Sequence, residues 1–153
     1  MKADYLKKIK AMEFSLEADD QVNWKKLDEA DIVLLGVSCT AKTPLSLYLG
    51  YLSYKTSNLP LVPELSLDLD KLSLYKEKMV GLTIKQSYLR KLRKRKVVDL
   101  GLPINSKYSQ PARITKEIEY AKKILVTLDI SVVDVTDKSI EKLATEVLKL
   151  IGL

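Results

Sequence analysis

The residues whose types and spacing could do chemistry lie together in one short segment, residues 36–43. The segment reads Gly-Val-Ser-Cys-Thr-Ala-Lys-Thr, which is close to the phosphate-binding P-loop pattern with Ala41 in place of the second glycine. In such a loop the backbone N–H groups turn inward around phosphate oxygens. The next helix points its partially positive N-terminus at the same anion. The segment is therefore expected to bind the phosphates of a nucleotide.

The side chains of this segment suggest individual roles. Lys42 is expected to place a full positive charge near the outer phosphates, and Thr43 to offer its hydroxyl to a phosphate-bound Mg²⁺. Gly36 lets the chain leave the preceding strand sharply. The other positions are expected to contribute backbone N–H groups and, from the serine and the threonine, hydroxyls: Val37, Ser38, Cys39, Thr40 and Ala41. The simpler alternative is a glycine turn with an incidental lysine.

A phosphate-binding loop needs a buried strand before it and a helix directly after it. Residues 32–35 form a short apolar run typical of a buried strand, and residues 43–52 are predicted to be helical, with Pro44 in the first turn. Further strands are predicted over residues 56–62, 79–84 and 131–135. Further helices are predicted over residues 4–17 and 87–99, over a long stretch that includes residues 114–128, and after a cap at Asp137.

Alternating strands and helices predict an α/β fold with a parallel sheet of about four strands and helices on both faces. Residues 1–153 are expected to form a single P-loop-type nucleotide-binding domain, because no repeat or low-complexity linker divides them. Ligands bind at the C-terminal edge of such sheets, which is where the 36–43 loop would lie.

Composition excludes several classes of protein. The chain has no histidine, so Ser-His-Asp hydrolases, histidine zinc sites and Cys-His nucleophiles are excluded. Its one cysteine fits a reducing compartment, and no apolar run is long enough to cross a membrane, so we expect a cytoplasmic protein. The net charge of +6 suits an anionic ligand, an acidic protein or nucleic acid without choosing among them.

Two more features outside the loop could bear on function. The basic run over residues 90–96 invites a nucleic-acid interpretation, but the chain has one phenylalanine and one tryptophan, so platforms for base stacking are scarce. A solvated helix face is the preferred interpretation for most of that run. Asp134 lies in an apolar strand and could orient Lys42 or a metal, or cap the following loop.

The chain resembles a known family over nearly its whole length. Residues 30–38, Thr40 and residues 42–46 look like the P-loop signature of the pyruvate, phosphate dikinase regulatory proteins. Other blocks resemble the family in the same order: residues 13–14, 19–20, 58–64, 81–84, 92–93, 100–102, Tyr108, 118–121, 133–136 and 139–141.

The resemblance implies a bifunctional protein threonine phosphotransferase. Such proteins use ADP to phosphorylate pyruvate, phosphate dikinase and use inorganic phosphate to remove the phosphate, releasing pyrophosphate; a sister branch acts on phosphoenolpyruvate synthase. It also implies roles for Asp19 or Asp20, as the base for the attacking threonine or a Mg²⁺ ligand, and for Arg93, as an anion contact. Tyr108 could reach a ligand from its loop or serve only in packing. The sequence does not fix the oligomeric state, and a homodimer is one alternative.

The chain departs from the family pattern in two ways. The family usually has arginine where Cys39 stands, and an arginine there would be a strong bidentate phosphate donor. The family also has a further N-terminal domain before the block that begins near Tyr5, and either an excised domain or a natural short form would explain its absence. Three alternatives therefore remain beside the leading one: a small-molecule P-loop kinase, a non-catalytic nucleotide-binding or docking module, and a nucleic-acid-binding protein.

Overall fold

A parallel sheet of four strands forms the centre of the computed structural model, which describes residues 2–153. The strands are β1 (Ile32–Gly36), β2 (Thr56–Pro60), β3 (Met79–Thr83) and β4 (Ser131–Asp134), in the spatial order β2-β1-β3-β4. Register pairs Leu34 with Asn58 on one side and with Val80 on the other. The predicted α/β fold with a parallel sheet of four strands is confirmed.

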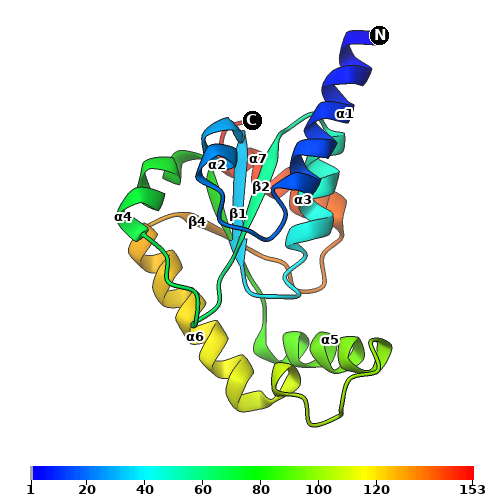
Figure 1. The fold of residues 1–153 in the computed structure, drawn as a ribbon, viewed down its shortest axis with the longest axis vertical. Coiled ribbons are helices and arrows are strands. Elements are labelled where there is room, and N and C mark those ends of the chain that lie inside the picture. Colours follow the sequence, from blue (N-terminus) through cyan, green and yellow to red (C-terminus); the bar gives the residue numbers. More distant parts are fainter. Residues whose placement is uncertain (1) are drawn as a thin grey trace.

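Helices cover both faces of the sheet (Figure 1). On one face α1 (Lys2–Glu17) packs against α3 (Lys42–Tyr51), which also contacts α7 (Ile140–Leu150). On the other face lies α6 (Pro111–Leu128), whose Leu125 approaches β3 so closely that a Cβ on Gly81 would lie 2.6 Å from its side chain. The remaining helical elements are α2 (Trp24–Glu29), α4 (Leu69–Leu72), η1 (Ser73–Lys78), α5 (Gln86–Asp99) and η2 (Lys107–Ser109).

The order of the strands places the 36–43 loop at a switch point. From β1 the chain moves outward to β2, and it then crosses to β3 on the opposite side of β1. Connections that leave a sheet in opposite directions open a crevice at the carboxyl ends of the strands. In Figure 1, α5 lies beyond this edge of the sheet, opposite the turn that joins β1 to α3. The loop and α5 therefore face one another.

Several local expectations are corrected by the structure. Ser139, not Asp137, caps α7, because its hydroxyl accepts the Lys142 N–H at 3.2 Å. Asp134 is exposed and accepts the Thr136 N–H at 2.9 Å, so it caps the following loop; hydrogen bonding from Thr136 lowers the pKa of this carboxyl. The helices α2 and α4 were not predicted, although each has a side-chain cap, Asn23 and Asp68.

The core lies between the two helical layers. Every residue of β1 is buried, as is usual for a central strand of a parallel sheet that is covered on both faces. Within residues 2–153, no helix is both long and apolar enough to cross a bilayer.

Candidate functional site

The backbone of the 36–43 loop is held by an internal contact. Thr40 is buried, and its hydroxyl donates to the Val37 carbonyl at 2.7 Å. A Cβ on Gly36 would lie 2.5 Å from that hydroxyl, so glycine is required here for space. This differs from the expected reason, a sharp exit from the strand. The Thr40 hydroxyl closes the loop and is turned away from the loop's outer surface.

Two non-glycine residues of the loop adopt left-handed backbone conformations. Cys39 has a φ of 73° and Ala41 a φ of 63°. Ala41 is also the residue before the first turn of α3, and no side chain caps that turn. The left-handed conformation at residue 41 explains why glycine is usual there, because a Cβ is unfavourable in that region.

The acidic pair after α1 meets the start of α3. Asp20 Oδ1 lies 3.0 Å from Lys42 Nζ, and the Lys42 side chain is only 7% exposed. Asp19 Oδ1 accepts hydrogen bonds from Thr43 Oγ1 and from Asn58 Nδ2, both at 2.8 Å. The structure therefore brings both aspartates to the two side chains that were expected to bind phosphate and Mg²⁺.

Asn58 on β2 connects this arrangement to the sheet. It is fully buried, and its Oδ1 accepts the Asp20 N–H at 2.8 Å while its Nδ2 donates to Asp19 and to Ser46 Oγ. A buried amide with this many partners fixes the backbone at Asp20 and the carboxylate of Asp19. The sequence predicts a strand at Asn58 but no role for its side chain; the one sequence signal for a role is a polar residue within a buried strand.

A cleft of about 490 Å³ opens between the 36–43 loop and α5. We call it the α5 cleft. Its charged lining consists of Lys42, Arg95, Lys96, Asp20 and Asp99, and its remaining lining residues are Ser38, Cys39, Ala41, Thr43, Pro44 and Leu92. The α5 cleft therefore has the size and positive charge to receive a phosphate chain, with α3's N-terminus on one wall.

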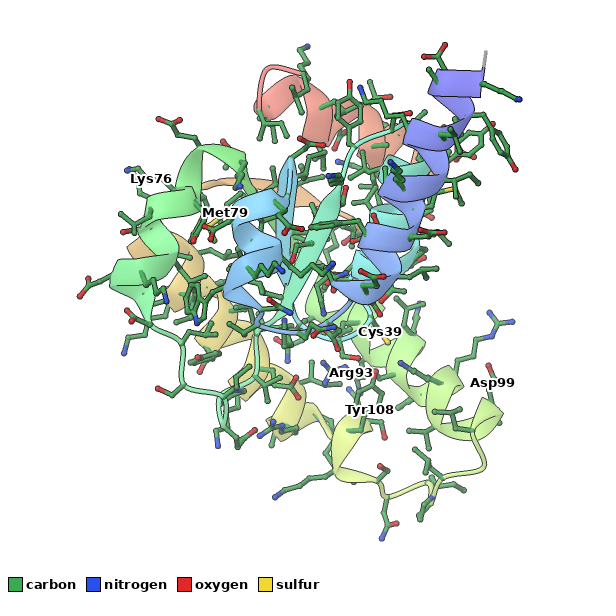
Figure 2. All side chains as sticks on the ribbon, turned by 45° about the horizontal axis from the view of Figure 1, so that its top comes forward. Cys39, Lys76, Met79, Arg93, Asp99 and Tyr108 are labelled. Atoms are coloured by element: carbon green, nitrogen blue, oxygen red, sulfur yellow. The ribbon has the colours of Figure 1, made fainter. Side chains whose placement is uncertain are left out.

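Arg93 lies behind the loop and is not among the residues that line the α5 cleft. Figure 2 shows it beside Tyr108 and near Cys39, with Asp99 farther along α5. The guanidinium is fully buried and forms a bidentate pair with Glu117, at 2.9 and 3.0 Å. The expected anion contact of Arg93 stays a prediction, and the α5 cations that do line the cleft are Arg95 and Lys96.

Tyr108 reaches the loop from η2. Its hydroxyl lies 2.8 Å from Ser38 Oγ and 2.9 Å from Cys39 Sγ. Burial, followed by the contact with Cys39, raises the pKa of the Tyr108 phenol, so the hydroxyl stays protonated at neutral pH. Tyr108 therefore does more than pack: its hydroxyl makes polar contacts with two side chains of the loop.

Comparison with known proteins identifies the family. The model of the kinase/pyrophosphorylase family matches residues 1–148. The chain belongs to this family. Three relatives named pyruvate, phosphate dikinase regulatory protein are similar to it. The protein of Thermoanaerobacter sp. (strain X514) is 41% identical over 98% of this chain and 56% of its own length. The proteins of Halothermothrix orenii (strain H 168) and Lysinibacillus sphaericus (strain C3-41) are 42% and 43% identical, each over 95% of this chain and 54% of their own length.

The chain thus spans about half the length of the curated relatives it matches. The predicted resemblance is confirmed by the family model.

The site offers oxygen donors of the kind that Mg²⁺ prefers. Thr43 Oγ1 and Asp19 Oδ1 lie 2.8 Å apart beside the cleft. No group of three or more histidine, cysteine, aspartate or glutamate side chains within residues 2–153 is arranged to hold a metal. Mg²⁺ commonly uses one or two carboxylates together with substrate phosphates and waters, so this small donor set fits it.

Proposed function

We propose that this chain is the nucleotide-binding part of a regulatory protein phosphotransferase that acts on pyruvate, phosphate dikinase or phosphoenolpyruvate synthase. The observation that carries the proposal is the meeting of Lys42 and Thr43 with Asp20 and Asp19 at the carboxyl edge of the sheet. Phosphoryl transfer depends mainly on positioning and on stabilising charge. A lysine, a helix N-terminus and an acidic pair beside one cleft provide those elements.

In the proposed reaction, ADP lies in the α5 cleft with its phosphates against the 36–43 loop. Lys42, Arg95 and Lys96 supply positive charge around the phosphates. Thr43 and Asp19 would hold Mg²⁺, which neutralises phosphate charge when bound. Asp20 lines the cleft and pairs with Lys42, so a terminal phosphate held by Lys42 would lie near Asp20.

The forward reaction transfers one phosphoryl group. The oxygen of the acceptor threonine bonds to the β-phosphorus of ADP, the bond from that phosphorus to the bridging oxygen breaks, and AMP leaves. Asp20, the more exposed of the two aspartates, takes the hydroxyl proton. In the second reaction inorganic phosphate attacks the phosphothreonine, and pyrophosphate and free threonine are the products.

Ligand binding tests the proposal most directly. Calorimetry and thermal shift with ADP, AMP, ATP, inorganic phosphate and pyrophosphate should show binding of ADP and pyrophosphate by the parent chain, with stabilisation that grows with ligand concentration. Lys42→Ala should weaken both at least tenfold, because a charge-assisted contact is worth about 1.5–3 kcal/mol. Lys123→Ala, an exposed lysine on α6, is the control and should bind as the parent does.

Equal ADP affinity in the parent and the Lys42→Ala variant would contradict the proposal. A chain that binds nucleotide but transfers no phosphoryl group to either partner enzyme would fit the docking-module alternative.

A further inference from the structure

A chain of paired charges runs behind the 36–43 loop, between α5 and α6, and is buried at its Arg93–Glu117 end. Arg93 of α5 pairs with both oxygens of Glu117 on α6, and Glu117 also accepts from Arg113 Nε at 2.9 Å. Arg113 continues the chain to Glu64, which follows β2. Arg93 is fully buried and Glu117 is 5% exposed. The two arginines and two glutamates of this charged cluster together carry no net charge.

Arg93 also holds the backbone of the two segments that meet at the loop. Its NH1 donates to the Tyr108 carbonyl at 3.2 Å, and its NH2 donates to the Ser38 carbonyl at 3.3 Å. The Tyr108 ring stacks on the guanidinium, with its centroid 4.5 Å from Cζ (Figure 2). The Tyr108 hydroxyl in turn contacts the Ser38 hydroxyl. Ser38 is thus held at both its carbonyl and its side chain.

The contact with the Ser38 carbonyl sets the direction of the next N–H group. The peptide bond between Ser38 and Cys39 is trans, as are all peptide bonds within residues 2–153. In a trans peptide the carbonyl and the following N–H point to opposite sides of the chain. With the carbonyl directed to Arg93, the Cys39 N–H is directed away from the guanidinium. Ser38 and Cys39 both line the α5 cleft, so the peptide that Arg93 fixes lies in the wall of that cleft.

We propose that Arg93 is a positioning residue, which Glu117 holds in place so that the loop presents the Cys39 N–H to a bound phosphate. The ligand in this inference rests on the proposed function; the effect on the shape of the loop does not. Lysine could not take the same position, because only the planar guanidinium can bind Glu117 in bidentate fashion and reach two carbonyls as well.

Glu117 separates this role from direct anion binding. It touches Arg93 and Arg113 and does not line the α5 cleft. If Arg93 bound the phosphate itself, removing the charge of Glu117 would release a cation and tighten binding. If Arg93 positions the loop, the same change loosens the loop and weakens binding. The sign of the effect therefore distinguishes the two roles.

The experiment uses Glu117→Gln, Arg93→Lys and the control Val97→Ala, a buried apolar residue of α5 that lies one helical turn after Arg93 and does not line the α5 cleft. For each variant that folds, the affinities for pyrophosphate and for ADP are measured by calorimetry. Amide hydrogen exchange of residues 38–42 is measured without ligand. Glu117→Gln and Arg93→Lys should both bind pyrophosphate about tenfold to a hundredfold more weakly, as is typical for loss of a group that orients a ligand contact.

Glu117→Gln and Arg93→Lys should also exchange the amides of residues 38–42 at least about tenfold faster, whereas Val97→Ala should change neither measurement. Unchanged or tighter pyrophosphate binding by Glu117→Gln would overturn the inference. If the parent chain binds neither ligand, the proposed function fails, and the exchange measurement still decides: unchanged exchange in Arg93→Lys and Glu117→Gln overturns the positioning role. Should either Glu117→Gln or Arg93→Lys not fold, the other is measured in the same way.

Discussion

Lys42 and Asp20 form an ion pair at the mouth of the α5 cleft, with Nζ 3.0 Å from Oδ1. The lysine is nearly buried, while the aspartate side chain is 52% exposed. A phosphate that approaches Lys42 must therefore displace or share this carboxylate. The same carboxylate is the group proposed to accept the proton of the incoming threonine, so it opposes binding and promotes transfer.

Asp20→Asn should separate these two effects. Without the carboxylate, ADP should bind up to about fivefold more tightly, since an ion pair with a half-exposed carboxylate is worth roughly 0.2–1 kcal/mol. Phosphoryl transfer should fall about 10²-fold to 10⁴-fold, the usual contribution of a general base. Calorimetry and a transfer assay on the same preparation check both. Asp137→Asn, an exposed aspartate before α7, should leave both unchanged. Full transfer by Asp20→Asn would remove Asp20 from the catalytic role.

Arg95 and Lys96 should supply the outer positive charge of the cleft. The double variant Arg95→Ala with Lys96→Ala is expected to bind pyrophosphate about tenfold more weakly, and its affinity should depend less on salt because fewer charges are screened. Titrations at low and high salt measure both effects. Arg90→Ala with Lys91→Ala removes the same two residue types from exposed positions of α5 outside the cleft, and should bind as the parent does. Equal losses in the two double variants would indicate a general effect of net charge.

Ala41 carries backbone strain that glycine would relieve. Its φ of 63° lies in the left-handed region, which costs a residue with a Cβ roughly 1–2 kcal/mol. Ala41→Gly should therefore raise the free energy of unfolding by about 1 kcal/mol in urea denaturation. Ala112→Gly is a control of opposite sign, since this exposed alanine of α6 is helical and should lose about 0.5–1 kcal/mol. A loss of stability in Ala41→Gly would show that the Cβ packs favourably.

The order of elements was predictable because each buried strand is followed by a break and then by a helical pattern. The apolar run before Gly36 and Pro44 after it identified the central strand and the helix that starts at the loop. Short helices escaped prediction. The six residues of α2 and the four of α4 are too few to show a helical period, so only their caps marked them.

Residues of the site were predictable where a local pattern carries the chemistry, as at Lys42 and Thr43. The partners of the site depend on tertiary contacts between distant segments. Arg93 and Arg95 are two residues apart in the same basic run, yet one is buried against Glu117 and the other lines the cleft. The two residues are both arginines of one basic run, so composition alone does not distinguish the buried one from the one at the cleft. Which face of α5 meets α6 decides between them, and that is set by packing far along the chain.

Glu64 should make stability depend on acid pH. A hydrogen bond from Arg113, opposed by some desolvation, lowers the pKa of this carboxyl from 4.5 to about 2. The unfolded chain binds the proton more readily, so the contact stabilises the fold above the ordinary pKa and loses this effect as pH falls toward about 2. The parent should therefore be more stable than Glu64→Gln at about pH 5, and by a smaller margin at about pH 3. Urea unfolding at both values measures the margin.

Glu119→Gln provides the comparison, because this exposed carboxylate of α6 forms no ion pair in the part of the chain that the structure describes. Its margin should be similar at the two pH values. A margin for Glu64→Gln that grows as the pH falls would mean that the Arg113 contact does not hold this carboxylate in solution.

Cys39 occupies the position where the family resemblance implies arginine, and its side chain lies at the wall of the α5 cleft beside Tyr108. Cys39→Arg should add a bidentate phosphate donor and tighten ADP binding about tenfold or more, since such contacts are worth about 1.5–3 kcal/mol. Transfer should be assayed with both the dikinase and the synthase. Cys39→Ser keeps a small polar group near Tyr108 without added charge, and should bind ADP as the parent does. An arginine variant that binds and transfers no better than the parent would indicate that Arg95 and Lys96 already supply this charge from α5. In that case the double variant at those two positions should regain affinity when Cys39→Arg is added.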